Sequence, residues 1–144
     1  MEGKFIVPIS MEELTAEEKA IFVTSLLYVM DLSKNQRMEY LTSRLKELGI
    51  SKEALKKIKH AKSPSEVCSL IKQIHDIKMR RYILREMILV AISNHELSDD
   101  EIATLYAIGT NIGIKEEKVG DFFIWAAKGL EWEIEGLQLI EGDL

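Results

Sequence analysis

Apolar residues recur at intervals of three and four along most of this chain, which is the spacing that lines one face of an α-helix. Runs that alternate apolar with polar residues, which would indicate strands, are absent, and the 144 residues include only two prolines. With 47% hydrophobic residues, a chain of this length can bury one core. We therefore predict a single all-α domain over residues 1–144, with residues 1–14 as an N-terminal arm and residues 129–144 as a C-terminal helical extension.

Capping residues mark where the helices begin and end. Thr15 and Glu18 have the spacing of a capping box, and so do Ser98 and Glu101. The apolar stripe of the first helix comprises Ile21, Phe22, Leu26, Val29 and Met30. About seven helices are expected. The first begins at Thr15, the second spans 34–48, where Ser33 can cap it and Gly49 ends it, and a short third helix follows Ser51. One helix follows Ser63, two span 78–94 and 99–112, the latter up to Gly113, and a last one continues, bent or broken, from near Lys115 to about residue 140.

Two parts of the sequence resemble each other. Residues 32–36, LSKNQ, match residues 97–101, LSDDE, and residues 48–55, LGISKEAL, match residues 112–119, IGIKEEKV, at offsets of 65 and 64. In both parts a serine that can cap a helix is followed by a helix, a glycine–isoleucine turn and another helix. This order indicates two pseudo-symmetric halves of three helices each, joined by the helix after Ser63.

Charge is segregated along the chain. Residues 1–33 carry a net charge of −4, residues 34–85 of +9 and residues 86–144 of −10. Opposite charges could pack against each other, or they could form two separate functional faces. No segment has the length of a membrane span or the pattern of a signal peptide, and Cys68 has no second cysteine to pair with. A reducing cytoplasm is therefore the expected location.

The stretch NHELSDDE, residues 94–101, concentrates groups that bind metal ions. The candidate ligands are Asn94, His95, Glu96, Asp99, Asp100 and Glu101. Carboxylates in a loop before a helix suit Ca²⁺ or Mg²⁺, and the imidazole would favour Mn²⁺ or Zn²⁺. The spacing matches neither an EF-hand nor a zinc-protease motif. A site for a divalent cation is therefore one interpretation of this stretch.

The same residues are also those expected at the start of a helix. Asp99, Asp100 and Glu101 would occupy the first three helical positions, where each carboxylate interacts with the helix dipole by roughly 0.3–1 kcal/mol. Glu101 can also accept a hydrogen bond from the backbone amide of Ser98. On this interpretation the stretch needs no ligand, and we favour it over the metal site.

An apolar helix, an acidic stretch, an amphipathic helix and a glycine–isoleucine turn follow one another in MILVAISNHELSDDEIATLYAIGTNIGI. Over residues 85–120 this order resembles the family of the tellurite-resistance protein TerB. Glu96 and Glu101 match the acidic positions of that family's signature, whereas Asn94 and His95 replace its usual Asp-Gly pair. The resemblance implies an all-α fold of two pseudo-symmetric halves and a role in a tellurite or stress response. It also implies that the acidic loop binds a divalent cation or a partner.

The basic residues between positions 52 and 85 could form a patch for nucleic acid or for anionic lipid at a membrane surface. The candidates for this patch are Lys52, Lys56, Lys57, Lys59, Lys62, Arg80, Arg81 and Arg85, with His60 among them. No aromatic residue is interleaved with the lysines to stack on bases, and the protein is acidic as a whole. We therefore do not expect nucleic-acid binding, whereas peripheral contact with a membrane stays open.

The C-terminal stretch carries bulky apolar residues and glycines at helical spacing. One face comprises Phe122, Trp125, Gly129, Trp132 and Gly136, and a second row comprises Leu130, Ile134 and Leu137. We expect Phe122 and Trp125 to lie in the core. If the helix projects from the domain, Trp132 and Leu137 are candidates for contact with a protein partner or for a homodimer.

No serine or cysteine has a recognisable nucleophile setting, and His60 and His75 stand apart from acids at ligand spacing. The leading hypothesis is therefore a non-enzymatic binding or scaffold domain that has no resident cofactor and acts with a protein partner. The alternative is a divalent-metal-binding domain that uses residues 94–101.

Overall fold

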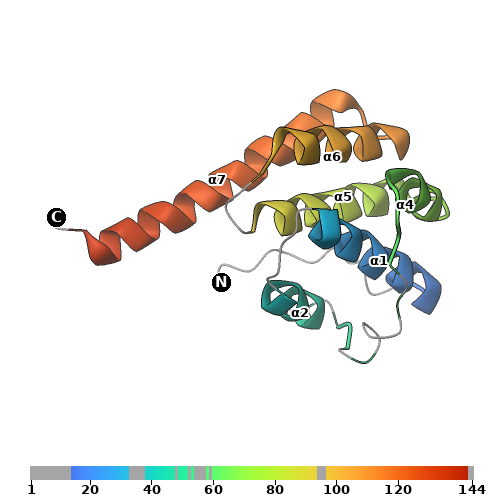
Figure 1. The fold of residues 1–144 in the computed structure, drawn as a ribbon, viewed down its shortest axis with the longest axis horizontal. Coiled ribbons are helices and arrows are strands. Elements are labelled where there is room, and N and C mark those ends of the chain that lie inside the picture. The colour runs from blue at the N-terminus through green and yellow to red at the C-terminus, as the bar shows by residue number, and fades with distance from the viewer. Residues whose placement is uncertain are drawn as a thin grey trace.

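The computed structural model describes residues 14–32, 38–47, 49–51, 53, 58, 60–93 and 97–142. All regular elements in this part of the chain are helices, which confirms the all-α prediction. They are α1 (Ala16–Leu32), α2 (Met38–Glu47), α4 (Pro64–Ile71), α5 (Ile77–Ile92), α6 (Asp99–Asn111) and α7 (Glu116–Glu141) (Figure 1). The cap expected at Ser33 falls outside these ranges, and so does most of the short helix expected after Ser51.

The predicted N-terminal caps of α1 and α4 are present. Thr15 N donates to Glu18 Oε1 at 3.0 Å, and Glu18 N donates to Thr15 Oγ1 at 3.1 Å. Ser63 Oγ accepts a hydrogen bond from Glu66 N at 3.2 Å, and Pro64 is the first residue of α4. The amide groups in the first turn of a helix have no partner within the helix, so these side chains determine where each helix begins.

The two glycine–isoleucine turns have the same geometry. Gly49 and Gly113 have positive φ angles of 78° and 93°. In each turn the glycine amide donates to the carbonyl three residues earlier, and the isoleucine amide donates to the carbonyl five residues earlier, at 2.8–3.1 Å. This is the Schellman motif, in which glycine adopts the left-handed conformation at low cost. Ile50 and Ile114, which follow the glycines, are both buried.

Helix α5 lies at the centre of the domain and packs against α1, α6 and α7 (Figure 1). It is buried on nearly all of its faces, and its fully buried side chains include Met79, Ile83, Leu84, Met87 and Ile88. Burying one such side chain contributes roughly 1.5–3 kcal/mol, so this helix supplies much of the driving force for folding.

Helix α1 is buried on all sides over its second half, rather than along one stripe as predicted. All residues from Ile21 to Met30 are buried, including the polar Thr24 and Ser25. Ser25 Oγ donates to the carbonyl of Ile21 at 2.8 Å, which satisfies the hydroxyl within the helix. The predicted stripe residues are in the core, but α1 packs against both α4 and α5 and is therefore covered more completely than an amphipathic pattern indicates.

Arg80 of α5 joins the C-terminal ends of two other helices. Its Nε and Nη2 donate to the carbonyls of Ile74 and Lys72, at 2.6 and 2.9 Å, and its Nη1 donates to the carbonyl of Ile112 at 3.0 Å. The last carbonyls of a helix lack partners within the helix and carry its negative dipole end, so a guanidinium is well suited to this position. Arg80 is thus part of the fold rather than a freely presented base.

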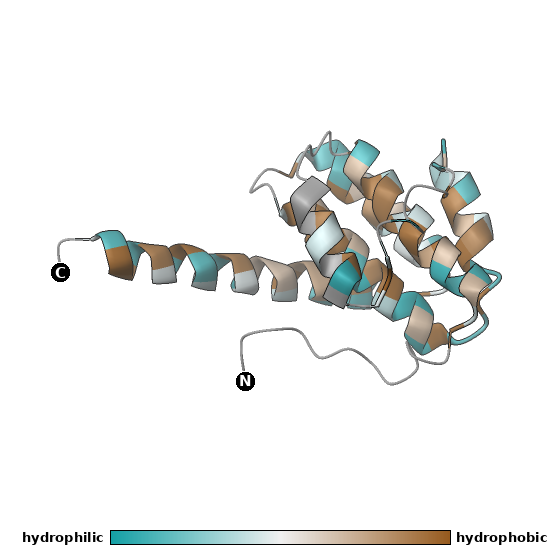
Figure 2. Ribbon diagram, turned by 90° about the horizontal axis from the view of Figure 1, so that it is seen from below, coloured by the Kyte–Doolittle hydropathy of each residue, from teal (hydrophilic) through white to brown (hydrophobic). Residues whose placement is uncertain are grey.

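Helix α7 runs from Glu116 to Glu141 without a break, so the helix that begins near Lys115 continues to about residue 140 uninterrupted. Its first half packs against α5 and α6, and Val119 and Ala126 are buried there. Its second half extends beyond the other helices (Figures 1 and 2). We refer to residues 128–141 as the α7 arm. Glycines cost helix stability but still donate their amide hydrogen bonds, which is why Gly129 and Gly136 do not interrupt the helix.

Gly109 lies where α6 approaches α5 and α7 closely. A Cβ atom at this position would be 2.7 Å from Val119 Cγ2 and 3.2 Å from Leu84 Cδ2. Val119 and Leu84 are fully buried, so neither can move away without disturbing the core. The absence of a side chain is what allows the helices to pack at this distance.

We predict that Gly109→Ala destabilises the protein by about 1–3 kcal/mol, because steric overlap with Val119 outweighs the higher helix propensity of alanine. Gly136→Ala is the matched control, since a Cβ atom there meets nothing within 4 Å, and it should be neutral or stabilising. Urea unfolding of the three proteins measures the difference. A Gly109→Ala variant as stable as the wild type would contradict the close packing of α6 against α7.

Candidate functional site

The acidic stretch is only partly described by the structure. Asn94, His95 and Glu96 lie outside the described residues, so their role as ligands stays a prediction. Asp99, Asp100 and Glu101 form the first turn of α6, and the first two are exposed. Within the described ranges, no three histidine, cysteine, aspartate or glutamate residues are grouped so that they could hold a metal ion.

Ser98 and Glu101 form the predicted capping box at the start of α6. Ser98 Oγ accepts a hydrogen bond from Glu101 N at 3.1 Å. Glu101 Oε1 in turn accepts from Ser98 Oγ at 3.0 Å and from Ser98 N at 3.5 Å. Asp99 and Asp100 add two carboxylates to the same turn, where the helix dipole favours negative charge. The local structure therefore accounts for Asp99, Asp100 and the Oε1 atom of Glu101 without a ligand.

One oxygen of Glu101 takes no part in the cap. Its Oε2 is buried and has no hydrogen-bond partner. A buried carboxylate oxygen that lacks a partner costs free energy, whereas in a metal site the same oxygen would be a ligand. This oxygen is the feature of α6 that a bound cation would explain and a helix cap does not.

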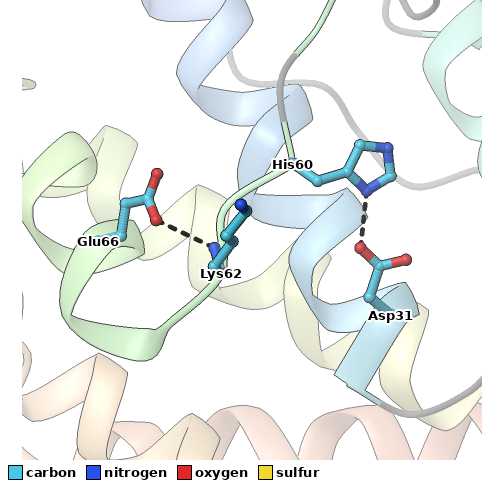
Figure 3. Close-up of polar contacts among 4 residues, drawn as sticks. All are labelled: Asp31, His60, Lys62 and Glu66. Atoms are coloured by element: carbon cyan, nitrogen blue, oxygen red, sulfur yellow. Dashed lines mark hydrogen bonds and ion pairs between the residues drawn. The ribbon is translucent and has the colours of Figure 1, made fainter.

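Asp31, which stands 65 positions before Glu96 and so matches it in the internal repeat, pairs with His60. The His60 Nδ1 and Asp31 Oδ2 atoms are 2.7 Å apart, and both side chains are more than half exposed (Figure 3). The contact joins the end of α1 to the segment before α4, where Lys62 N donates to Glu66 Oε2 at 3.0 Å. The sequence interpretation treated His60 as isolated, because its partner lies 29 residues away. An exposed pair of this kind is worth about 0–1 kcal/mol.

A second polar cluster lies between α5 and α7. Arg85 Nε and Nη2 are both 3.1 Å from Oε2 of Glu86, a carboxylate that is only 1% exposed. The same guanidinium lies over the ring of Tyr82, at 4.6 Å from the centroid, and over the ring of Trp125, at 5.5 Å. Arg85 was considered as one member of a basic patch, but ion pairing and cation–π contacts hold it against the core.

An open pocket of about 360 Å³ lies beside this cluster and is lined by Arg85, Lys118, Asp121, Phe122 and Trp125. Phe122 packs partly buried against the core, as predicted. The prediction that Trp125 is a core residue is wrong, since it is 37% exposed. Its ring covers the Arg85 guanidinium at the rim of the domain. The spacing of apolar residues, on which the prediction was based, does not indicate contacts with charged groups.

All exposed large hydrophobic side chains in the described part of the chain lie on α7. They are Ile124, Trp125, Trp132, Ile134, Leu137, Leu139 and Ile140. Trp132 is 76% exposed and Leu137 is 52% exposed, so both residues predicted to contact a partner are accessible to one. Figure 2 shows the α7 arm extending away from the other helices.

Cys68 is buried in α4, as the sequence indicated. Burial raises the pKa of its thiol, and the positive charge of Lys72 opposes this only in part. A thiol is nucleophilic only when ionised, so Cys68 is a packing residue rather than a reactive group. Burial likewise raises the pKa of Tyr28.

No protein-family model, curated protein or solved structure matches the chain. None of the helices that the structure describes is both long enough and apolar enough to cross a membrane. The site therefore has to be interpreted from its own geometry, which offers two candidate surfaces: the acidic start of α6 and the apolar α7 arm.

We predict that divalent cations leave the unfolding temperature unchanged, because the capping box already accounts for the acids of α6. Chelator-stripped protein is unfolded alone and with Ca²⁺, Mg²⁺, Mn²⁺ or Zn²⁺. A cation that binds only the native state, at about 100 times its Kd, would add about 2.7 kcal/mol, which is a readily measured shift.

The same titration is repeated with the double variant Glu96→Ala, Asp99→Ala and with the control Glu116→Ala, Glu117→Ala, which removes acids from the first turn of α7. A cation-dependent shift in the wild type and the control that disappears in the double variant would contradict the prediction. It would make residues 94–101 a metal site.

Proposed function

We propose that this protein is a non-enzymatic binding or scaffold domain whose α7 arm contacts a protein partner. The main observation in support of this proposal is the concentration of exposed large hydrophobic side chains on α7. A single exposed leucine or tryptophan needs no explanation on a protein surface, but a contiguous group of them marks an interaction site.

The stability of the arm supports the same conclusion. Nearly all residues from Glu131 to Glu141 are exposed, so little tertiary packing stabilises them. Helices shorter than about 12–15 residues are marginal in water without such packing. Gly129 and Gly136 each lower the stability of the helix by roughly 1 kcal/mol relative to alanine. A partner that covers the arm would supply the missing stabilisation.

The domain itself would be TerB-like, with two pseudo-symmetric halves. The matching Schellman motifs at Gly49 and Gly113 support the two halves, since they occupy equivalent places in the internal repeat. The capped acidic turn at Ser98 occupies the place of the acidic loop in the TerB signature. On this proposal the protein acts in a tellurite or stress response in the cytoplasm.

The alternative function is that of a divalent-metal-binding domain. The observation that favours it is the buried Glu101 Oε2, which has no hydrogen-bond partner. Neighbouring ligands would have to come from Asn94, His95 and Glu96. The cation titration distinguishes this alternative from the binding domain.

The proposal is tested by site-specific photo-cross-linking in cells. A benzophenone amino acid replaces Trp132 or Leu137 on the arm, or Ala103, an exposed residue of α6, as the matched control. We expect adducts of a discrete mass from positions 132 and 137 and none from position 103, because only the arm would lie in an interface. Adducts that form equally at position 103, or no adduct at any position, would contradict a binding role of the arm.

A further inference from the structure

The apolar stripe that anchors α7 to the domain continues into the arm. In the first half of the helix the stripe consists of Val119, Phe123 and Ala126, which are buried or packed against the core. At the same intervals of three and four it continues through Leu130, Ile134 and Leu137. Ile134 is 43% exposed, so the stripe that faces other helices within the domain faces solvent in the arm. Its spacing is that of a contact with another helix.

A second row on α7, which continues into the arm, repeats every seven residues. Trp125, Trp132 and Leu139 follow one another at this interval, and so do Gly129 and Gly136 beside them. A Cβ atom at either glycine would meet nothing within 4 Å. A seven-residue repeat of bulky and small positions is the pattern on which a second helix packs its side chains. The arm therefore offers rows and depressions that fit a helix.

The charge of the arm restricts which helix can pack there. Residues 128–141 contain one base, Lys128, and the acids Glu131, Glu133, Glu135 and Glu141. Two arms that paired with each other would bring these carboxylates together, which is unfavourable at an interface. Among the side chains whose burial the structure describes, those outside α7 include no exposed large hydrophobic residue that a second copy could offer to the arm. Anionic lipid would be repelled by the same carboxylates.

We infer that the α7 arm binds a basic amphipathic helix of a partner protein. The apolar side chains of that helix would pack on the face of the arm that carries Gly136, between Trp132 on one side and Leu137 on the other, and its lysines or arginines would lie beside the glutamates. This inference rests on the proposed function and names the chemical class of the partner.

A model peptide serves as the probe. It is a helical leucine–lysine peptide that carries leucine at i, i+3, i+4 and i+7, is long enough to span the arm, and bears a fluorescent label. The matched peptide has glutamate at every lysine position. In fluorescence anisotropy with the full-length protein, the Kd of the lysine peptide should be at least about tenfold lower than that of the glutamate peptide. The affinity of the lysine peptide should fall as the salt concentration rises.

Variants locate the site on the arm. Leu137→Ser and Trp132→Ser should each weaken binding of the lysine peptide by about tenfold, as expected for central contacts of an interface. Ile124→Ser is the matched control, because Ile124 is 58% exposed on the same helix but outside both rows, and it should leave the Kd unchanged. Gly136→Ala should weaken binding by about tenfold through overlap with the peptide, although it favours the free helix.

Equal affinity for the two peptides, or binding that is indifferent to Leu137→Ser, would overturn the inference. Light scattering on the full-length protein separates this failure from a failure of the proposed function. A dimer that Leu137→Ser dissociates would show that a second copy occupies the arm, so the inference would be wrong while the arm stays an association surface. A monomer that binds neither peptide and forms no cross-linked adduct would overturn both.

Discussion

The burial of α5 on nearly all of its faces is the constraint on which the rest of the fold depends. A helix with apolar side chains around its whole circumference has to be enclosed by other helices, and α1, α6 and the first half of α7 provide that enclosure. Two arginines of α5 are accommodated within it. Arg80 satisfies carbonyls at the ends of α4 and α6, and Arg85 neutralises the buried Glu86. Because α7 must cover α5, its direction is determined, and its second half extends beyond the domain.

Interactions between residues that are only a few positions apart were predictable from the sequence. The capping boxes at Thr15 and Ser98 and the turns at Gly49 and Gly113 are each made by residues three to five positions apart, so their chemistry is visible in the sequence. Contacts between distant residues were not predictable in this way. The pairing of His60 with Asp31 depends on the packing of helices far apart in the chain.

Two predictions that differ from the structure, the core position of Trp125 and the single buried stripe of α1, failed for related reasons. Helical spacing shows which residues share a face, but not how many neighbouring helices that face will meet. Trp125 shares a face with Phe122 and was expected to share its burial, yet it lies at the rim of the domain over Arg85. At the acidic stretch the sequence defined the candidate residues, and three of them lie in the first turn of α6, while residues 94–96 lie outside the described ranges.

The two candidate surfaces differ in what remains to be explained. At α6, hydrogen bonds and the helix dipole account for nearly every acid. At the α7 arm, nothing within the described domain accounts for a row of exposed tryptophan, leucine and isoleucine side chains on a helix weakened by two glycines. We therefore propose that the function lies on the arm, and that α7 consists of a part that folds with the domain and a part that binds a partner.

Backbone amide hydrogen exchange along α7 of the free protein tests this claim most directly. Amides from Phe123 to Ala127 should exchange only when the whole domain unfolds, because that part of α7 is packed against α5 and α6. Amides from Glu133 to Glu141 should exchange much faster through local opening, because that part of the helix is exposed. Protection as strong at Ile140 as at Ala126 would contradict the claim, since it would show that the arm is already stabilised by packing in the free protein.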